Sequence, residues 1–134
     1  MTDQLRGDEA NDAGGAYAPM VLVVDDEKNI RRMFDLVLTG EGYAVTTVGS
    51  AEAAMKVIAQ PNSPVDLVIL DIKLPKMSGL EMLAKLRNDD ASKDVPVIVV
   101  SGHATLQDAV QAIKLGAADF FEKPLNNFNE NCRI

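Results

Sequence analysis

From residue 20 onward, short apolar runs alternate with longer segments whose apolar residues recur every three or four positions. The short runs have the length and period of buried strands, and the longer segments have the period of amphipathic helices. Several of the runs are apolar at consecutive positions, as strands covered on both faces of a parallel sheet must be. The sequence therefore predicts a βα repeat. The strand-like runs are MVLVV (20–24), YAVTTV (43–48), DLVIL (66–70), VPVIVV (95–100) and DFF (119–121).

Four helical segments lie between these runs, and each has a residue that starts or stops it. Serine and threonine predict N-caps, and a threonine followed three residues later by an aspartate predicts a capping box. The signals are Gly40 and Gly42 after the first segment, Ser50 and Pro61 around the second, Ser78 and Gly79 before the third, and Thr105, Asp108 and Gly116 around the fourth. The predicted apolar stripes are Ile30, Met33, Phe34, Val37 and Leu38; Ala54, Val57 and Ile58; Met82, Leu83 and Leu86; and Ala109, Val110 and Ile113.

The alternation predicts an α/β fold with a single domain. Strands and helices of this length pair in parallel through right-handed crossovers, and five strands favour an open doubly wound sheet over a barrel. Residues 20–124 form the predicted domain, because residues 1–19 are rich in Gly, Ala, Asp and Asn and have the composition of a disordered leader. The asparagine-rich segment LNNFNENCRI, residues 125–134, predicts only a short or frayed fifth helix, or a point of truncation.

Composition narrows the classes of function. The chain carries a formal net charge of −7, 4% aromatic residues and no Trp, so it offers neither a basic face nor a stacking platform for nucleic acid. No apolar segment has the length of a membrane span, and the first residues do not resemble an export signal. The single cysteine, Cys132, excludes an internal disulfide and fits a reducing compartment. We expect a cytoplasmic protein that contacts neither nucleic acid nor membrane directly.

Polar residues follow four of the five predicted strands. Asp25 and Asp26 follow the first, Asp71 the third, Ser101 the fourth and Lys123 the fifth. Because the carboxyl ends of parallel strands share one edge of the sheet, these side chains are expected to converge. Three close carboxylates repel one another unless a cation neutralises them, and an all-oxygen site suits Mg²⁺. A lysine and a hydroxyl beside an aspartate also fit a phosphoryl group, which the carboxylate could attack to form an acyl phosphate.

Four segments carry a resemblance to a known family. VLVVDDE, LVILDIKLPKMSGLE, VIVVSGHAT and AIKLGAADFFEKP resemble the receiver domain of two-component response regulators. The segments GHAT and AIKLGAADFFEKP are most similar to the nitrogen-regulation branch of the sigma-54 activators. The resemblance covers roughly residues 20–124, and it implies a flavodoxin-like sheet with strand order 2-1-3-4-5.

The resemblance implies a role for each residue at the strand ends. Asp71 resembles the phospho-acceptor, and Asp25 and Asp26 resemble the acidic pair that binds Mg²⁺ together with Asp71 and the backbone carbonyl of Lys73. Lys123 resembles the phosphate partner, followed by a peptide bond to a proline that is usually cis in this family.

Three further positions resemble the parts that transmit or time the signal. Ser101 resembles the switch hydroxyl that moves onto the phosphoryl group, and Phe120 the aromatic side chain whose inward rotation follows. Lys73 and His103 occupy positions that vary in the family and tune dephosphorylation. From the residues alone, however, His103 also fits a solvated loop histidine, Phe121 competes with Phe120 for the packed position, and the acidic pair also fits a helix cap.

The function that the resemblance implies is a phosphorylation-controlled switch. A sensor histidine kinase would donate the phosphoryl group to Asp71, and the face of the fourth helix and fifth strand would change its affinity for a downstream output domain or protein. The chain would catalyse only its own phosphotransfer and autodephosphorylation, and a homodimer stays an open alternative.

Three other classes of function are alternatives to this switch. An aspartate-nucleophile phosphatase commonly has a second aspartate two residues after the nucleophile, where this chain has Lys73. A nucleotide or flavin carrier would need a phosphate-binding loop, and no G-x-G-x-x-G follows the first strand. A receiver-like interaction module that takes no phosphate is the remaining alternative.

Overall fold

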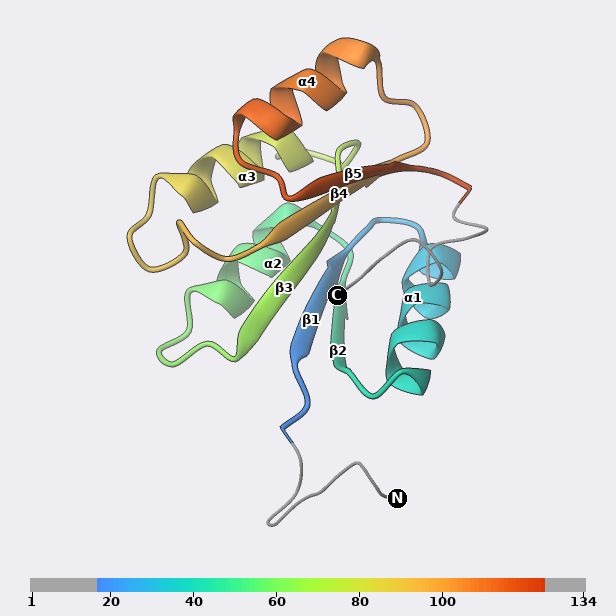
Figure 1. Cartoon of the computed structure of the whole chain (residues 1–134), viewed down its shortest axis with the longest axis vertical. Coiled ribbons are helices and arrows are strands. Elements are labelled where there is room, and N and C mark those ends of the chain that lie inside the picture. The colour runs from blue at the N-terminus through green and yellow to red at the C-terminus, as the bar shows by residue number, and fades with distance from the viewer. Residues whose placement is uncertain (1–16, 125–134) are drawn as a thin grey trace.

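The computed structural model describes residues 17–124 of the chain (Figure 1). Within this range, parallel strands form one sheet in the order β2-β1-β3-β4-β5, which confirms the predicted doubly wound, flavodoxin-like fold. The predicted short fifth helix and most of the predicted leader lie outside the described residues. The elements are β1 (Met20–Val24), α1 (Lys28–Gly40), β2 (Ala44–Val48), α2 (Ala51–Ile58), β3 (Val65–Asp71), α3 (Gly79–Arg87), β4 (Val97–Ser101), α4 (Leu106–Lys114) and β5 (Asp119–Glu122).

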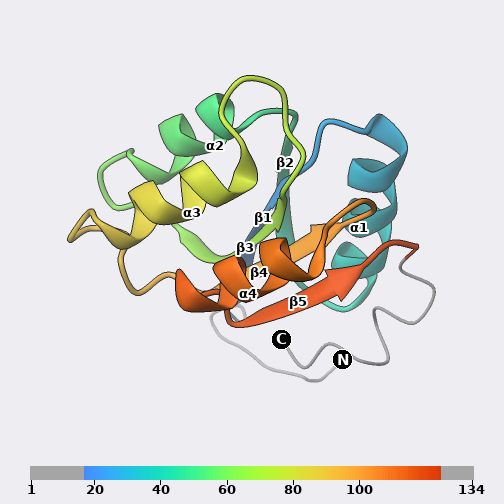
Figure 2. The ribbon, with the colours of Figure 1, turned by 90° about the horizontal axis from the view of Figure 1, so that it is seen from above.

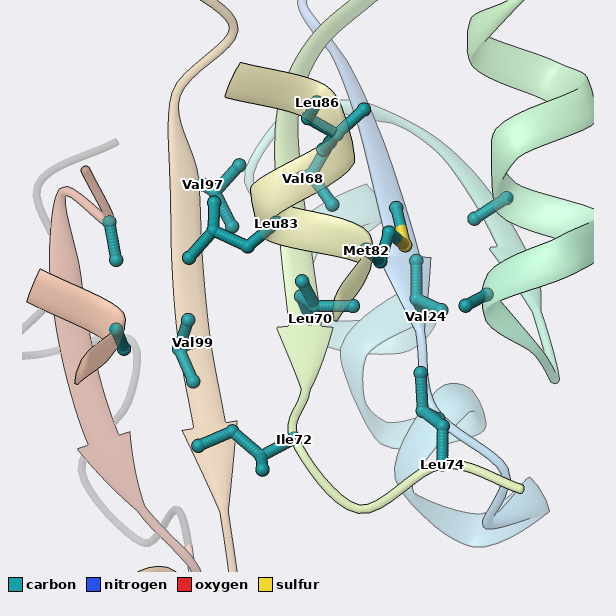
Figure 3. Close-up of a cluster of buried hydrophobic side chains, with 14 of the residues drawn as sticks. Val24, Val68, Leu70, Ile72, Leu74, Met82, Leu83, Leu86, Val97 and Val99 are labelled. Atoms are coloured by element: carbon teal, nitrogen blue, oxygen red, sulfur yellow. The ribbon is translucent and has the colours of Figure 1, made fainter. Parts of the chain in front are cut away.

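Successive residues of the central strands face opposite sides of the sheet and enter two separate cores. On one side, Phe34 and Leu38 of α1 pack on alternate residues of β1, β3 and β4. On the other side, α2, α3 and α4 cover the remaining strand residues, and Met82 and Leu83 of α3 are fully buried (Figures 1, 2 and 3). The strands are apolar at consecutive positions because both of their faces are covered.

The predicted caps of α2, α3 and α4 are all present. Ser50 Oγ accepts a hydrogen bond from Ala53 N at 3.1 Å. Ser78 and Glu81 form a reciprocal capping box at the start of α3, and Thr105 and Asp108 form another at the start of α4. These caps satisfy backbone N–H groups that a helix leaves without partners in its first turn.

The predicted inward stripe of α4 is wrong at two positions. Val110 and Ile113 are 44% and 53% exposed, and the buried residue of this helix is Ala112. α4 lies beside β5 at the edge of the sheet (Figure 1), where a small alanine can approach the strands closely. The apolar stripe of larger residues therefore faces outward, and with Leu106, which is 81% exposed, it forms an apolar surface on α4.

The described residues before β1 contact the domain at the amino ends of the strands. The Tyr17 hydroxyl donates a hydrogen bond to the Asp66 carboxylate, and Met20 N donates to the same carboxylate at 2.9 Å. Ala44 N donates to the Pro19 carbonyl at 2.9 Å. These contacts hold the start of β1 beside β2 and β3. No helix among residues 17–124 combines the length and the apolar character needed to cross a membrane.

Candidate functional site

The sheet brings the predicted site residues to its carboxyl edge. Asp25 follows β1 directly, Asp71 is the last residue of β3, Ser101 is the last residue of β4, and Lys123 follows β5 directly. The parallel register places Asp71 opposite Val100, and Ser101 opposite Glu122. The strands therefore end at nearly the same level, and side chains that are distant in sequence become neighbours.

Lys123 joins two of the buried carboxylates. Its Nζ lies 2.9 Å from Asp25 Oδ2 and 3.2 Å from Asp71 Oδ2. The three side chains are 12%, 1% and 5% exposed, in the order Lys123, Asp25, Asp71. Among the described residues, no aligned hydrogen bond reaches Asp25 Oδ2, so the ion pair with Lys123 is what compensates this buried oxygen.

Burial and crowding shift the ionisation of this group. The pKa of Asp71 is raised, chiefly because burial disfavours its charged form and also because the Asp25 carboxylate repels it, while Lys123 opposes the shift. Burial alone would lower the pKa of Lys123, but the Asp25 and Asp71 carboxylates outweigh it and raise that pKa. The site holds more negative charge than the single ammonium balances.

Asp25, Asp26 and Asp71 form a group that fits a divalent cation. One carboxylate oxygen of each lies within 4.8 Å of the others; Asp25 and Asp71 are buried, and Asp26 is exposed. Glu27 N donates to Asp25 Oδ1 at 2.9 Å, and Lys73 N donates to Asp71 Oδ1 at 3.2 Å, so local backbone orients both buried carboxylates. An all-oxygen set that is open to water on one side suits Mg²⁺, which keeps several water ligands.

Ser101, His103 and Phe120 lie around this centre. Ser101 is 1% exposed, and its Oγ accepts a long hydrogen bond from His103 N at 3.4 Å. The His103 side chain is exposed. Phe120 packs on the α3 and α4 side of the sheet and Phe121 on the α1 side, and both are half-buried. Phe120 also lines a hollow of about 510 Å³ between α4 and β5. The peptide bond between Lys123 and Pro124 is cis.

Two supporting residues were not singled out from the sequence for this site. Arg31 Nη1 donates to the Asp25 carbonyl at 2.7 Å and so holds the loop that carries the acidic pair. The sequence carried one sign of this role: Arg31 lies near the start of α1, where a positive charge opposes the helix dipole. A Cβ at Gly79 would overlap the Asp71 carbonyl oxygen and lie 2.8 Å from Ile72 Cα, so the glycine allows α3 to begin against the end of β3.

The sequence matches the response regulator receiver domain family over residues 21–130. The chain therefore belongs to this family, whose members are the receiver parts of two-component response regulators. Its arrangement of β1–β5 is also found in a solved signal receiver domain of a putative Luxo repressor protein from Vibrio parahaemolyticus. That structure has a TM-score of 0.76 and 32% identity, and the match covers 85% of both chains.

Longer curated relatives include proteins of the nitrogen-regulation branch. A putative response regulator NtrX-like from Rickettsia bellii is 42% identical over 109 residues, which cover 80% of this chain and 22% of the relative. The nitrogen assimilation regulatory protein NtrX from Azorhizobium caulinodans is 41% identical over 110 residues, which cover 79% of this chain and 23% of the relative. The resemblance to nitrogen-regulation receivers is thus confirmed, and the chain spans less than a quarter of the length of these two relatives.

Proposed function

We propose that this receiver domain is a phosphorylation-dependent switch that takes a phosphoryl group on Asp71 from a sensor histidine kinase. The observation that carries the proposal is the buried Asp71 carboxylate, which lies beside the Asp25 and Asp26 carboxylates and within 3.2 Å of the Lys123 ammonium. A structural ion pair would need only one carboxylate for one lysine. The excess of negative charge fits a site that binds a cation during phosphoryl transfer.

Asp25, Asp26 and Asp71 would hold Mg²⁺, with the backbone carbonyl of Lys73 as a further ligand. The ion would supply positive charge that offsets the phosphoryl oxygens. An Asp71 oxygen attacks phosphorus while the bond from phosphorus to the histidine nitrogen of the donor breaks, and the histidine keeps the electron pair of that bond. Lys123 pairs with the phosphoryl oxygens, and the Ser101 hydroxyl donates a hydrogen bond to one of them.

Phosphorylation would then change the surface of the domain through movements in β4, β5 and α4. Movement of Ser101 toward the phosphoryl group leaves room for Phe120 to rotate inward from the hollow beside α4. The face of α4 and β5 changes shape, and its affinity for an output domain or a downstream protein changes with it. The catalysis of this chain would be limited to its own phosphotransfer and autodephosphorylation, with Lys73 and His103 as the side chains that tune the second step.

The test uses the chain with a small phosphodonor in place of the kinase. Incubation with Mg²⁺ and acetyl phosphate should add one phosphoryl group to the intact mass of the wild type and none to Asp71→Asn. Asp90→Asn, which changes a fully exposed aspartate, should behave as the wild type. If the wild type stays unmodified while it binds Mg²⁺, the domain is an interaction module that takes no phosphate.

A phosphatase that turns over external substrates is the weaker candidate. Such enzymes commonly have an aspartate as acid and base two residues after the nucleophile, and this chain has Lys73 there. The Lys73 ammonium pairs with Asp108. Release of inorganic phosphate from phosphate esters at many turnovers per chain would favour that alternative over the switch.

A further inference from the structure

One ion pair links the candidate acceptor loop to α4. Lys73 lies two residues after Asp71, and its backbone N–H donates to Asp71 Oδ1 at 3.2 Å. Its side-chain Nζ lies 3.8 Å from Asp108 Oδ2. A single residue therefore touches the acceptor carboxylate through its backbone and the first turn of α4 through its side chain.

Asp108 serves the start of α4 in two ways. Its Oδ2 accepts a hydrogen bond from Thr105 N at 3.0 Å, and its own backbone N–H donates to Thr105 Oγ1 at 3.1 Å. The hydrogen bond from the Thr105 backbone, with help from the Lys73 charge, holds the pKa of Asp108 below its ordinary value. The carboxylate is therefore charged at neutral pH, and it caps the helix whether or not Lys73 is beside it.

Among the described residues, α4 buries little of its own side-chain volume. Its buried residue is Ala112, while Leu106, Val110 and Ile113 face outward. A helix held by one small buried side chain moves more easily than one held by several large ones. A charged tether at its first turn can therefore influence where α4 lies.

We propose that the Lys73–Asp108 ion pair couples occupancy of Asp71 to the position of α4, an inference that rests on the proposed function. A phosphoryl group on Asp71 adds negative charge next to the backbone of Lys73, and its ammonium, on a side chain 56% exposed, is free to turn toward it. The pair with Asp108 then breaks, and the first turn of α4 loses its tether to the acceptor loop. In the unmodified domain Asp108 acts as a positioning residue, because it keeps the Lys73 ammonium away from the site.

The test is a double-mutant cycle on the affinity for beryllofluoride, a stable mimic of the phosphoryl group, measured by ¹⁹F NMR in the presence of Mg²⁺. Asp108→Asn removes the charge but keeps an oxygen that can accept from Thr105 N. It should tighten binding by about two- to fivefold, since exposed ion pairs contribute this much to an equilibrium. In the Lys73→Met background the same change should have no effect. The factor should also shrink in about 1 M salt, which screens exposed charges.

A matched control is available beyond the C-terminal end of α3, in the segment that leads to β4. Lys93 and Asp90 form an exposed ion pair, also at 3.8 Å, that lies away from the acceptor loop. Asp90→Asn should leave the affinity for beryllofluoride unchanged in both the wild-type and the Lys93→Met backgrounds. An equal factor for Asp108→Asn with and without Lys73 would overturn the coupling and leave the switch intact. Absence of beryllofluoride binding in the wild type would instead overturn the proposed function, and the coupling with it.

Discussion

Replacing Lys123 by methionine tests the charge balance at the carboxyl edge of the sheet. The substitution keeps an unbranched apolar side chain, one heavy atom shorter, and removes the ammonium that lies 2.9 Å from Asp25 Oδ2 and 3.2 Å from Asp71 Oδ2. It leaves two buried carboxylates without a cation. Without Mg²⁺, we expect the domain to become markedly less stable at neutral pH.

The distances give the scale of the effect. At an effective dielectric constant of about 20, charges this far apart attract by roughly 5–6 kcal/mol per pair. Part of this attraction is offset because the lysine no longer has to be desolvated and because one carboxylate can bind a proton. A net loss of about 3–5 kcal/mol in the free energy of unfolding is the usual cost of removing one partner from a buried ion pair.

The loss should depend on pH in a defined direction. The pKa of Asp71 in the folded state is already raised by burial and by Asp25, and removal of Lys123 raises it further. A carboxyl group with a raised folded pKa adds stability below its unfolded pKa, and this stability is lost as pH rises through the folded value. The deficit of Lys123→Met should therefore be smaller near about pH 4–5 than near about pH 8, given an unfolded pKa of about 4 for Asp71.

Urea unfolding followed by circular dichroism, in the presence of EDTA, measures this deficit across the pH range. Lys93→Met is the control, because it removes one partner of an exposed ion pair and should change the free energy of unfolding by less than about 1 kcal/mol. Saturating Mg²⁺ should recover part of the stability of Lys123→Met, since the ion neutralises the same carboxylates. A deficit below about 1 kcal/mol at pH 8, or one that grows as pH falls, would refute this account of the charge balance.

Three further changes test individual parts of the fold. Gly79→Ala should cost about 1–3 kcal/mol of stability, since the new methyl group collides with the backbone of Asp71 and Ile72; an unchanged urea midpoint would contradict this. Ser78→Ala should cost about 1 kcal/mol of stability, because the capping box of α3 is lost. Ser78→Thr keeps a hydroxyl that can cap the helix, so thermal unfolding should show a stability close to that of the wild type. Ile113→Ser on the outer face of α4 should change stability by less than about 0.5 kcal/mol, and a loss above about 2 kcal/mol would show that this face is packed.

The strands and the positions of Asp25, Asp71, Ser101 and Lys123 could be predicted because two simple constraints act together. Apolar runs without alternation identify strands covered on both faces, and parallel pairing places the residue after each run at one edge. The ion pairs of Lys123 follow from this topology, although their distances do not. Caps were also predictable, since they depend on side chains within one turn of sequence.

Other features depend on packing between distant segments, which periodicity does not report. Val110 and Ile113 form a regular apolar stripe, yet they are exposed and Ala112 is the buried residue of α4. A small side chain lets the helix lie close to the edge of the sheet, and the spacing of apolar residues does not report this. The run DFF does not reveal which phenylalanine faces α4, because β5 is short and half-covered on each side. Gly79 was predicted only as the start of a helix; its closeness to the Asp71 carbonyl arises from the path of the chain between β3 and α3.

Chemical trapping identifies the residue that carries the phosphoryl group. After incubation with acetyl phosphate and Mg²⁺, borohydride reduces an aspartyl phosphate to homoserine, and tandem mass spectrometry of the resulting peptides locates that residue. We expect homoserine at position 71, with Asp25 and Asp26 unmodified and no conversion when EDTA replaces Mg²⁺. Homoserine at position 25 or 26, or conversion at position 71 that does not depend on the metal, would contradict this expectation.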